Sequence, residues 1–278
     1  MTKLKMWDPN KWNESELEWE KSAREAKKNN PIKMLSVLPK MVGITPETAK
    51  FLKWKSLWWM ITKDKDWKVF KGFFKRPFKH IYRLLSSALK TRPYVRKDDF
   101  FFYGIKNTKE FENLLTKDNT ILILGFSYCH KPFECPSGRF TPNCISDLEN
   151  PVCRQCFIGK AVHAGKEKQT IPLFIPTIHY IGQKVFEIVE QHPKHEIIFI
   201  ITACEMTLEM FGDWGNMAGI KGIGVRLDGR ICNTMKAFAL SENGIKPGLT
   251  VVTDETQGLI MSLLKCRKQR HLTFFEGK

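Results

Sequence analysis

The first 117 residues of this 278-residue chain contain no cysteine, and nowhere does the chain have a run of about 18 apolar residues. A helix needs such a run to cross a bilayer, so we expect no transmembrane helix. Residues 1–40 are polar and charged and lack the apolar segment of a secretory signal, which favours a cytoplasmic location. Because cytoplasmic thiols stay reduced, the later cysteines indicate metal ligands or redox groups before disulfides.

Acidic residues are scarce between Lys50 and Lys97. This stretch has fifteen Lys and Arg residues but only two acidic ones, Asp64 and Asp66. This stretch accounts for most of the net charge of +16. Such an excess indicates a polyanionic partner, either nucleic acid or the anionic surface of a membrane.

Aromatic residues recur at helical spacing through residues 46–92. Thr45 and Pro46 are typical of a helix start, and a helix from there to about Thr62 would carry Phe51 and Trp54 on one face, together with Trp58 and Trp59. Aromatic faces bordered by lysines suit the headgroup region of an anionic bilayer, so we predict peripheral membrane binding through residues 46–92. One alternative is that these helices pack on the rest of the chain. Nucleic acid ranks third, because a helical period differs from an exposed stacking platform.

The N-terminal residues 10–30 are predicted to form a separate, charged and exposed helix. From Thr120 onward, short apolar runs at residues 121–126, 171–175, 197–201, 223–227 and 249–252 alternate with helical stretches. This alternation predicts an α/β fold with a mostly parallel sheet covered by helices on both faces. Pro172 favours either an edge position for the second strand or a place at the start of that strand. We divide the chain into a basic, aromatic-rich helical region, 1–117, and a cysteine-rich α/β domain, 118–278.

Seven of the eight cysteines lie between residues 129 and 232. Cys129, Cys204 and Cys232 each follow a predicted strand, and the carboxyl ends of parallel strands meet at one edge of a sheet. We therefore expect these three thiols to form a cofactor site with an open coordination position. Cys204 and Cys232 also precede predicted helices, whose dipoles favour the thiolate, so both are candidate catalytic residues.

The other four cysteines of this group lie on a proline-containing excursion after the first strand. Cys153 and Cys156 form a C-x-x-C pair, and Cys135 and Cys144 would complete a four-thiolate metal site, although Cys129 could replace either of these two. We expect the cysteines to bind an iron–sulfur cluster of the [4Fe–4S] type, with zinc as the alternative, and the sequence leaves open which of them share a site.

Several short motifs carry a family resemblance between residues 120 and 240. They are Leu124-Gly125-Phe126-Ser127-Tyr128-Cys129-His130, Cys135-Pro136, Cys153-Arg154-Gln155-Cys156 followed by Ile158-Gly159-Lys160, Ala203-Cys204, and Gly229-Arg230-Ile231-Cys232-Asn233-Thr234. In this order they resemble the family called domain of unknown function 116. The resemblance implies a cysteine-rich α/β domain that binds an iron–sulfur cluster or a metal, with no established reaction. Family members often have another cysteine soon after the C-x-x-C pair, where this chain has Phe157-Ile158-Gly159, and Cys144 could compensate.

These features lead to three hypotheses for function. The first is an iron–sulfur protein with a redox or cluster-dependent enzymatic role at the cytoplasmic surface of a membrane. The second is a zinc-stabilised, non-enzymatic module that binds nucleic acid or a protein partner. The third is a thiol-redox protein in which Cys153 and Cys156 cycle through a disulfide; against it, this pair does not follow a strand as in thioredoxin-like proteins.

Overall fold

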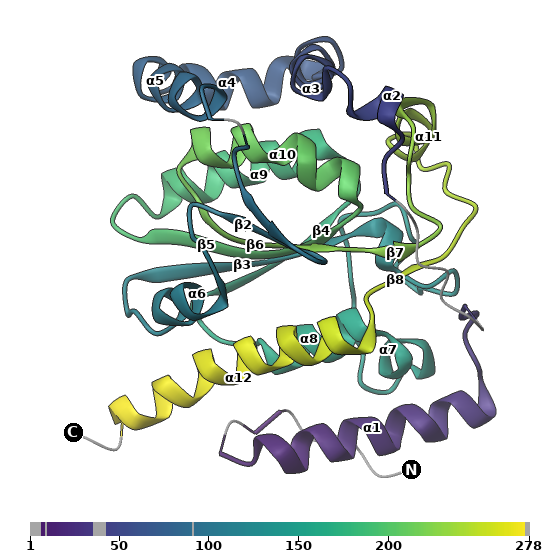
Figure 1. Cartoon of the computed structure of the whole chain (residues 1–278). Helices are drawn as coiled ribbons and strands as arrows, with labels where there is room; N and C mark the ends of the chain where they lie inside the picture. Colours follow the sequence, from purple (N-terminus) through teal and green to yellow (C-terminus); the bar gives the residue numbers. More distant parts are fainter. Residues whose placement is uncertain (1–6, 9, 36–42, 91, 276–278) are drawn as a thin grey trace.

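The centre of the molecule is a six-stranded sheet (Figure 1), in a computed structural model that describes residues 7–8, 10–35, 43–90 and 92–275. The strand order is β1-β2-β6-β5-β3-β4. Strands β3 to β6 are parallel to one another. Strand β2 pairs antiparallel with β6, and β1 pairs antiparallel with β2. The strands are β1 (Val95–Lys97), β2 (Phe100–Tyr103), β3 (Thr120–Ser127), β4 (Thr170–Ile175), β5 (Glu196–Ala203) and β6 (Lys221–Arg226). The predicted α/β fold with a mostly parallel sheet is confirmed.

Continuous apolar runs place β3 and β5 at the middle of the sheet, where both faces are buried. Leu122 and Leu124 of β3 pack into one hydrophobic cluster, whereas Ile121 and Ile123 pack into another on the opposite face. This alternation follows from the two-residue period of a strand. The predicted edge strand is also confirmed, because β4, which contains Pro172, pairs only with β3 among the described residues.

Helices cover both faces of the sheet (Figure 1). One face carries α9 (Ile178–Gln191) and α10 (Glu205–Ala218), and the other carries α6 (Thr108–Leu115), α8 (Phe157–Ala164) and α12 (Asp254–Phe275). Two short helices, α7 (Pro151–Gln155) and α11 (Met235–Ser241), flank the strand ends. Helix α10 extends to Ala218, and Gly219 ends it in a left-handed conformation with φ 78°.

A further layer of helices lies outside α9 and α10. It comprises α2 (Pro46–Ala49), α3 (Leu52–Thr62), the 3₁₀ turn η1 (Lys65–Trp67), α4 (Lys68–Phe74) and α5 (Pro77–Ala88). The predicted cap is confirmed, because Thr45 Oγ1 accepts a hydrogen bond from the backbone N–H of Thr48. The predicted continuous helix from Pro46 to Thr62 is wrong. It breaks at Phe51, whose φ of 57° is left-handed, and α3 starts there in a new direction.

The N-terminal helix α1 (Trp12–Asn29) is docked and only partly exposed, which corrects the expectation of an exposed helix. Trp12 and Trp19 are buried, one every two turns. Lys160 of α8 pairs with the carboxylates of Glu16 at 3.0 Å and Glu20 at 2.6 Å. The charged residues of α1 therefore form its outer side and its polar contact with α8.

Two elements differ from the predicted topology. The predicted fifth strand, residues 249–252, becomes β8 (Thr250–Val251), which pairs with β7 (Asp228–Gly229) outside the main sheet. The short run Phe100–Tyr103, which the sequence did not suggest as a strand, joins β6 as β2. Residues 95–103 therefore contribute to the sheet although they precede the compositional boundary at residue 117.

Candidate functional site

The sheet has a topological switch point between β3 and β5. The chain leaves β3 to form β4 on one side and then crosses to β5 on the other side. Such a reversal opens a crevice at the carboxyl ends of the two strands, which is where α/β proteins bind their ligands. A pocket lies there, and its lining includes Cys129, Cys204, Thr177 and Glu242.

The structure brings Cys129, Cys204 and Cys232 together at this edge. Cys129 and Cys204 line the pocket and Cys232 lies beside Cys204, and we call this site the three-cysteine pocket. Cys129 follows β3 in the turn η2 (Tyr128–His130), and Cys204 is the N-cap of α10. Cys232 lies on the segment between β7 and α11, and all three side chains are buried.

Cys232 carries the most acidic thiol of the three. The Cys204 thiol donates a hydrogen bond to it, and the Lys246 ammonium lies 3.2 Å from its Sγ atom, so the pKa of Cys232 is lowered. That hydrogen bond and burial raise the pKa of Cys204 well above its ordinary value. Burial also raises the pKa of Cys129. The sequence suggested helix dipoles as the cause for Cys204 and Cys232, but α11 has Thr234 as its N-cap, and the partners of Cys232 are a thiol and an ammonium.

A carboxyl group that the sequence did not point to lies in the same pocket. Glu242 is half-buried, and the loss of contact with water raises its pKa to about 8. Its Oε2 atom accepts a hydrogen bond of 3.0 Å from the backbone N–H of Ile178, in the first turn of α9. Near neutral pH this side chain is therefore mostly protonated and can supply a proton beside the three-cysteine pocket.

Cys135, Cys144, Cys153 and Cys156 line a second, smaller cavity, which we call the four-cysteine cavity. Cys135 and Cys144 lie on the irregular excursion after η2, Cys153 lies in α7, and Cys156 is the N-cap of α8. Pro151 at the first position of α7 and the cap of Asn150 on the Val152 N–H fix the start of this C-x-x-C turn.

Backbone amide groups near three of these four sulfurs act to lower the pKa of the thiols. They belong to Ser137 for Cys135, to Asp147 for Cys153, and to Ile158 and Gly159 for Cys156. These amides favour thiolates, but burial outweighs them and raises the pKa of Cys153 to about 11 and that of Cys156 to about 12. At neutral pH these thiols are therefore protonated, although the amides near them would stabilise thiolates.

A buried lysine orders the excursion around the four-cysteine cavity. Lys131 is 2% exposed, and its ammonium donates to the carbonyl oxygens of Gly138 (3.1 Å), Thr141 (2.8 Å) and Asn143 (2.7 Å). It holds the loop between Cys135 and Cys144 in place. Burial lowers the pKa of Lys131, which the nearby cysteines oppose.

Arg139 connects the two cysteine groups. Its guanidinium donates to the carbonyl oxygens of Lys131 (3.1 Å) and Cys129 (3.2 Å), and also to that of Lys246 (2.9 Å). Lys246 in turn contacts Cys232. The four-cysteine cavity and the three-cysteine pocket thus share one hydrogen-bonded framework.

Among the residues that the structure describes, no group of three or more His, Cys, Asp or Glu side chains is arranged so that it could hold a metal ion. Four sulfurs around one zinc would lie about 3.8 Å apart, because each Zn–S bond is about 2.3 Å long. The four cysteines line one cavity, but their side chains are not arranged around a single ion in this way.

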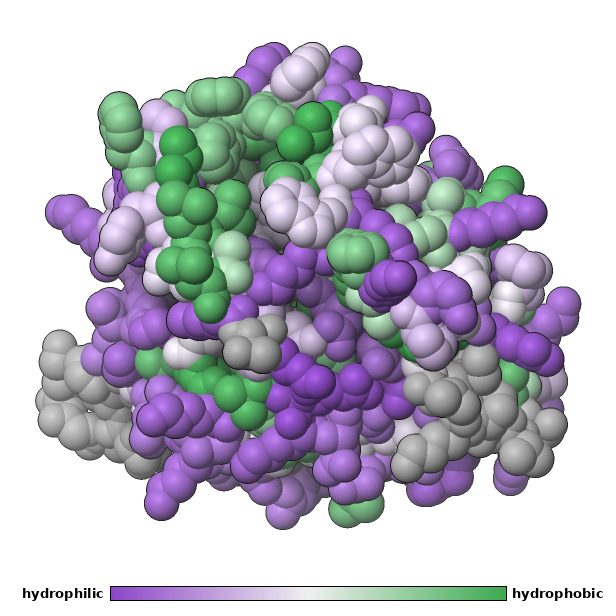
Figure 2. All heavy atoms as spheres, turned by 45° about the horizontal axis from the view of Figure 1, so that its top comes forward, coloured by the Kyte–Doolittle hydropathy of each residue, from purple (hydrophilic) through white to green (hydrophobic). Residues whose placement is uncertain are grey.

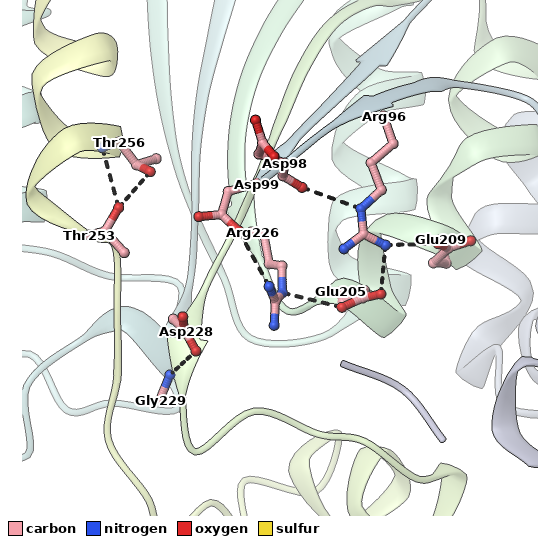
Figure 3. Close-up of polar contacts among 10 residues, drawn as sticks. All are labelled: Arg96, Asp98, Asp99, Glu205, Glu209, Arg226, Asp228, Gly229, Thr253 and Thr256. Carbon is pink, nitrogen blue, oxygen red and sulfur yellow. Dashed lines mark hydrogen bonds and ion pairs between the residues drawn. The ribbon is translucent and has the colours of Figure 1, made fainter. Parts of the chain in front are cut away.

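A cluster of buried charges fixes the helix start that carries Cys204 (Figure 3). Arg226, at the end of β6, contacts Glu205 at 3.2 Å and Asp99 at 3.3 Å. Arg96 of β1 donates to the other oxygen of Glu205 at 2.8 Å and also points toward Glu209. Because Glu205 directly follows Cys204, this cluster determines where the Cys204 thiol lies.

The sequence identified the seven clustered cysteines but not the charged groups that control them. Lys131, Lys246 and Glu242 come from three separate segments, and no spacing in the sequence relates them to the cysteines.

Three comparisons with known proteins complete the description of the site. No protein-family model matches the chain. The search of curated proteins gave no match, and neither did the search of solved structures.

Proposed function

We propose that this chain is an iron–sulfur redox protein whose cluster is held by Cys135, Cys144, Cys153 and Cys156. The observation that supports this most is that the four cysteines line one cavity, where backbone amides near three of the sulfurs favour the thiolate form. Hydrogen bonds to the sulfurs are one of the means by which proteins stabilise such clusters and set their reduction potentials.

The charge around the four-cysteine cavity supports the same choice. The Lys131 ammonium offsets part of the negative charge that four thiolates would bring.

We further propose that the three-cysteine pocket is the reactive centre of the protein. A bound cluster would supply one-electron transfer, and the chain itself contributes the groups around it. Lys246 and Cys204 hold negative charge on the Cys232 sulfur, Glu242 retains a proton near neutral pH, and Arg139 links this pocket to the four-cysteine cavity.

The proposal includes a cytoplasmic location, since free thiols beside a cluster require a reducing compartment. It also agrees with the resemblance to domain of unknown function 116, whose cysteine-rich character the chain shares.

Anaerobic purification followed by iron, sulfide and zinc analysis tests the cluster. We expect about four iron and four sulfide per chain, with the visible absorption of a [4Fe–4S] cluster. Cys153→Ser and Cys156→Ser should each lose most of the iron, because each removes a ligand. Cys266→Ser, in α12 and outside both cysteine groups, is the matched control and should keep it. A colourless protein with one zinc and no iron would contradict the proposal.

A zinc-stabilised binding module remains the second candidate, because residues 131–150 contain no helix or strand and a metal would order them. In that case Cys153→Ser should unfold the excursion, whereas replacing Cys204 or Cys232 should change little. A nucleic-acid partner would show affinity that falls steeply with salt concentration.

A further inference from the structure

Helix α5 has its apolar side toward the solvent. Phe78, Ile81, Tyr82, Leu85 and Leu89 recur at helical spacing on one face, and their exposed fractions range from 45% for Ile81 to 89% for Leu89. A helix at the surface of a globular protein normally turns such a stripe toward the core.

The opposite side of α5 meets α10 through polar contacts. Ser87 donates to Asp213 (2.7 Å) and accepts from Asn216 (2.9 Å), and Arg83 donates to the carbonyl oxygen of Ala218 (3.3 Å). His80 is buried and contacts the carbonyl oxygen of Phe73 at 2.8 Å. The helix is thus fixed by its polar side, and its apolar stripe is left without a partner among the described residues.

Helix α3 and the residue before it repeat this arrangement. Phe51, Trp54 and Trp58 are 65%, 70% and 57% exposed, whereas Trp59 and Met60 face inward. Trp59 packs against Phe238 of α11 at a ring separation of 5.3 Å. Helix α3 is therefore packed against the rest of the molecule through its inner side, and its outward residues are exposed all the same.

Together with Trp67 and Phe74, these residues form one continuous apolar face over α3, α4 and α5, shown in Figure 2 as green and pale spheres with hydrophilic residues at its edges. It is far larger than the scattered apolar residues of an ordinary surface, and such faces mark sites of interaction.

Cations without acidic partners border this face. Arg76 precedes α5 and Lys79 lies on it, and neither forms an ion pair within the described part of the chain. Repulsion from Arg83, with burial and Arg76 adding to it, lowers the pKa of Lys79. The electrostatic potential beside this face is therefore positive.

We propose that the face formed by α3, α4 and α5 binds the surface of an anionic lipid bilayer. Its rings and aliphatic side chains would enter the interface between headgroups and acyl chains, and its lysines and arginines would meet lipid phosphates. No helix of the described residues is long and apolar enough to span a membrane, so this binding is peripheral.

The chemistry of the face favours a bilayer over two other occupants. A second copy of this chain would bring the same cations into contact with each other. Single-stranded nucleic acid stacks on aromatic rings, but it offers no apolar medium for Ile81, Leu85 and Leu89.

Co-sedimentation with vesicles tests the proposal, using phosphatidylcholine alone and phosphatidylcholine mixed with phosphatidylserine. We expect binding to the anionic vesicles that weakens with salt. The double variant Phe78→Ser, Leu89→Ser should lose about tenfold or more in affinity, since both side chains would leave the bilayer. Leu17→Ser, Ile245→Ser is the matched control, because both residues are exposed but lie outside the face, and it should bind like the wild type.

The α5 variant removes side chains that are 87% and 89% exposed, so it should fold, which its near-UV circular dichroism checks. Absence of vesicle binding at low salt overturns the proposal. Two other results would also overturn it if the protein does not bind vesicles. One is a dimer that the double variant converts to a monomer, and the other is binding of single-stranded nucleic acid that this variant abolishes. Since these readouts do not require a cluster, they are independent of the iron and sulfide analysis.

Discussion

At the scale of single residues, the chemistry of the site depends on charged groups that lie next to sulfur. Lys246 lies against Cys232, Lys131 orders the loop between Cys135 and Cys144, and Glu242 is held protonated by burial. A cysteine count indicates a site, but these neighbours decide which thiol is a thiolate and where a proton can be stored.

Replacing Lys246 by Met should raise the pKa of Cys232, because the thiolate would lose the cation at 3.2 Å. The Cβ chemical shift of Cys232 in cysteine-labelled protein, followed by NMR against pH, should then reach its midpoint at higher pH. Lys236→Met, an exposed lysine of α11, serves as the control and should leave the profile unchanged. Identical profiles for Lys246→Met and the wild type would show that Lys246 does not set this pKa.

Glu242 should make the protein less stable as the pH rises. Its pKa is about 8 in the folded chain and about 4.3 when exposed, so folding retains a proton that the unfolded chain releases between these values. The stability this contributes is fully present below the unfolded pKa and is lost as the pH rises through about 8.

Glu242→Gln should flatten this pH dependence and exceed the wild type in stability above pH 8, in urea unfolding measured between about pH 5 and 9. Glu255→Gln, at an exposed position of α12, should keep the wild-type slope. An unchanged slope in Glu242→Gln would refute the assignment.

At the scale of elements, the start of α10 is held by opposite charges taken out of water. Glu205 is 5% exposed and Arg226 is 6% exposed, and Arg96 supplies a second cation from β1 (Figure 3). Two strands and one helix are thus joined next to the Cys204 thiol.

Arg226→Met should therefore destabilise the fold by about 3 kcal/mol, because it leaves buried carboxylates short of a partner. The midpoint of urea unfolding measures this loss. Arg230→Met, at an exposed position four residues further along, should change it by less than about 0.5 kcal/mol. If both variants unfold at the same midpoint, the charge cluster does not stabilise α10.

The elements that the sequence predicted are those with long, regular apolar patterns. β3 and β5 are continuous runs of isoleucine, leucine and phenylalanine that are buried on both faces, and their lengths and parallel order follow from that. β1 and β2 are short, and β2 becomes a strand because it pairs with β6, a contact that no local pattern contains.

The sequence also could not predict which way an amphipathic helix turns its apolar face. The periodicity of residues 46–92 predicted helices, but a stripe has the same spacing whether it faces the core or the solvent. Only the polar contacts of Ser87 and Arg83 with α10 show that the stripe of α5 faces outward. Likewise, the sequence could place cysteines at strand ends but could not supply Lys246 or Glu242, which arrive from a distant loop and helix.

At the scale of the whole molecule, the chain forms tiers around one sheet. The outermost helices on one side are α3, α4 and α5, and α1 lies outermost on the other side (Figure 1). The excess positive charge is concentrated in residues 50–97, and the cysteines belong to the strand ends and the excursion after β3. The molecule therefore separates a cationic apolar face from a thiol-rich edge.

That separation has a consequence for encounter with other molecules. The carboxyl ends of the parallel strands lie at the side of the molecule in Figure 1, by β7 and β8, whereas α3 to α5 lie on top. If a bilayer binds the face formed by α3, α4 and α5, the crevice at the switch point opens to the side, parallel to the plane of the membrane. Partners on the same membrane surface would then reach this edge of the molecule by lateral diffusion in two dimensions, at a fixed height and with a restricted orientation.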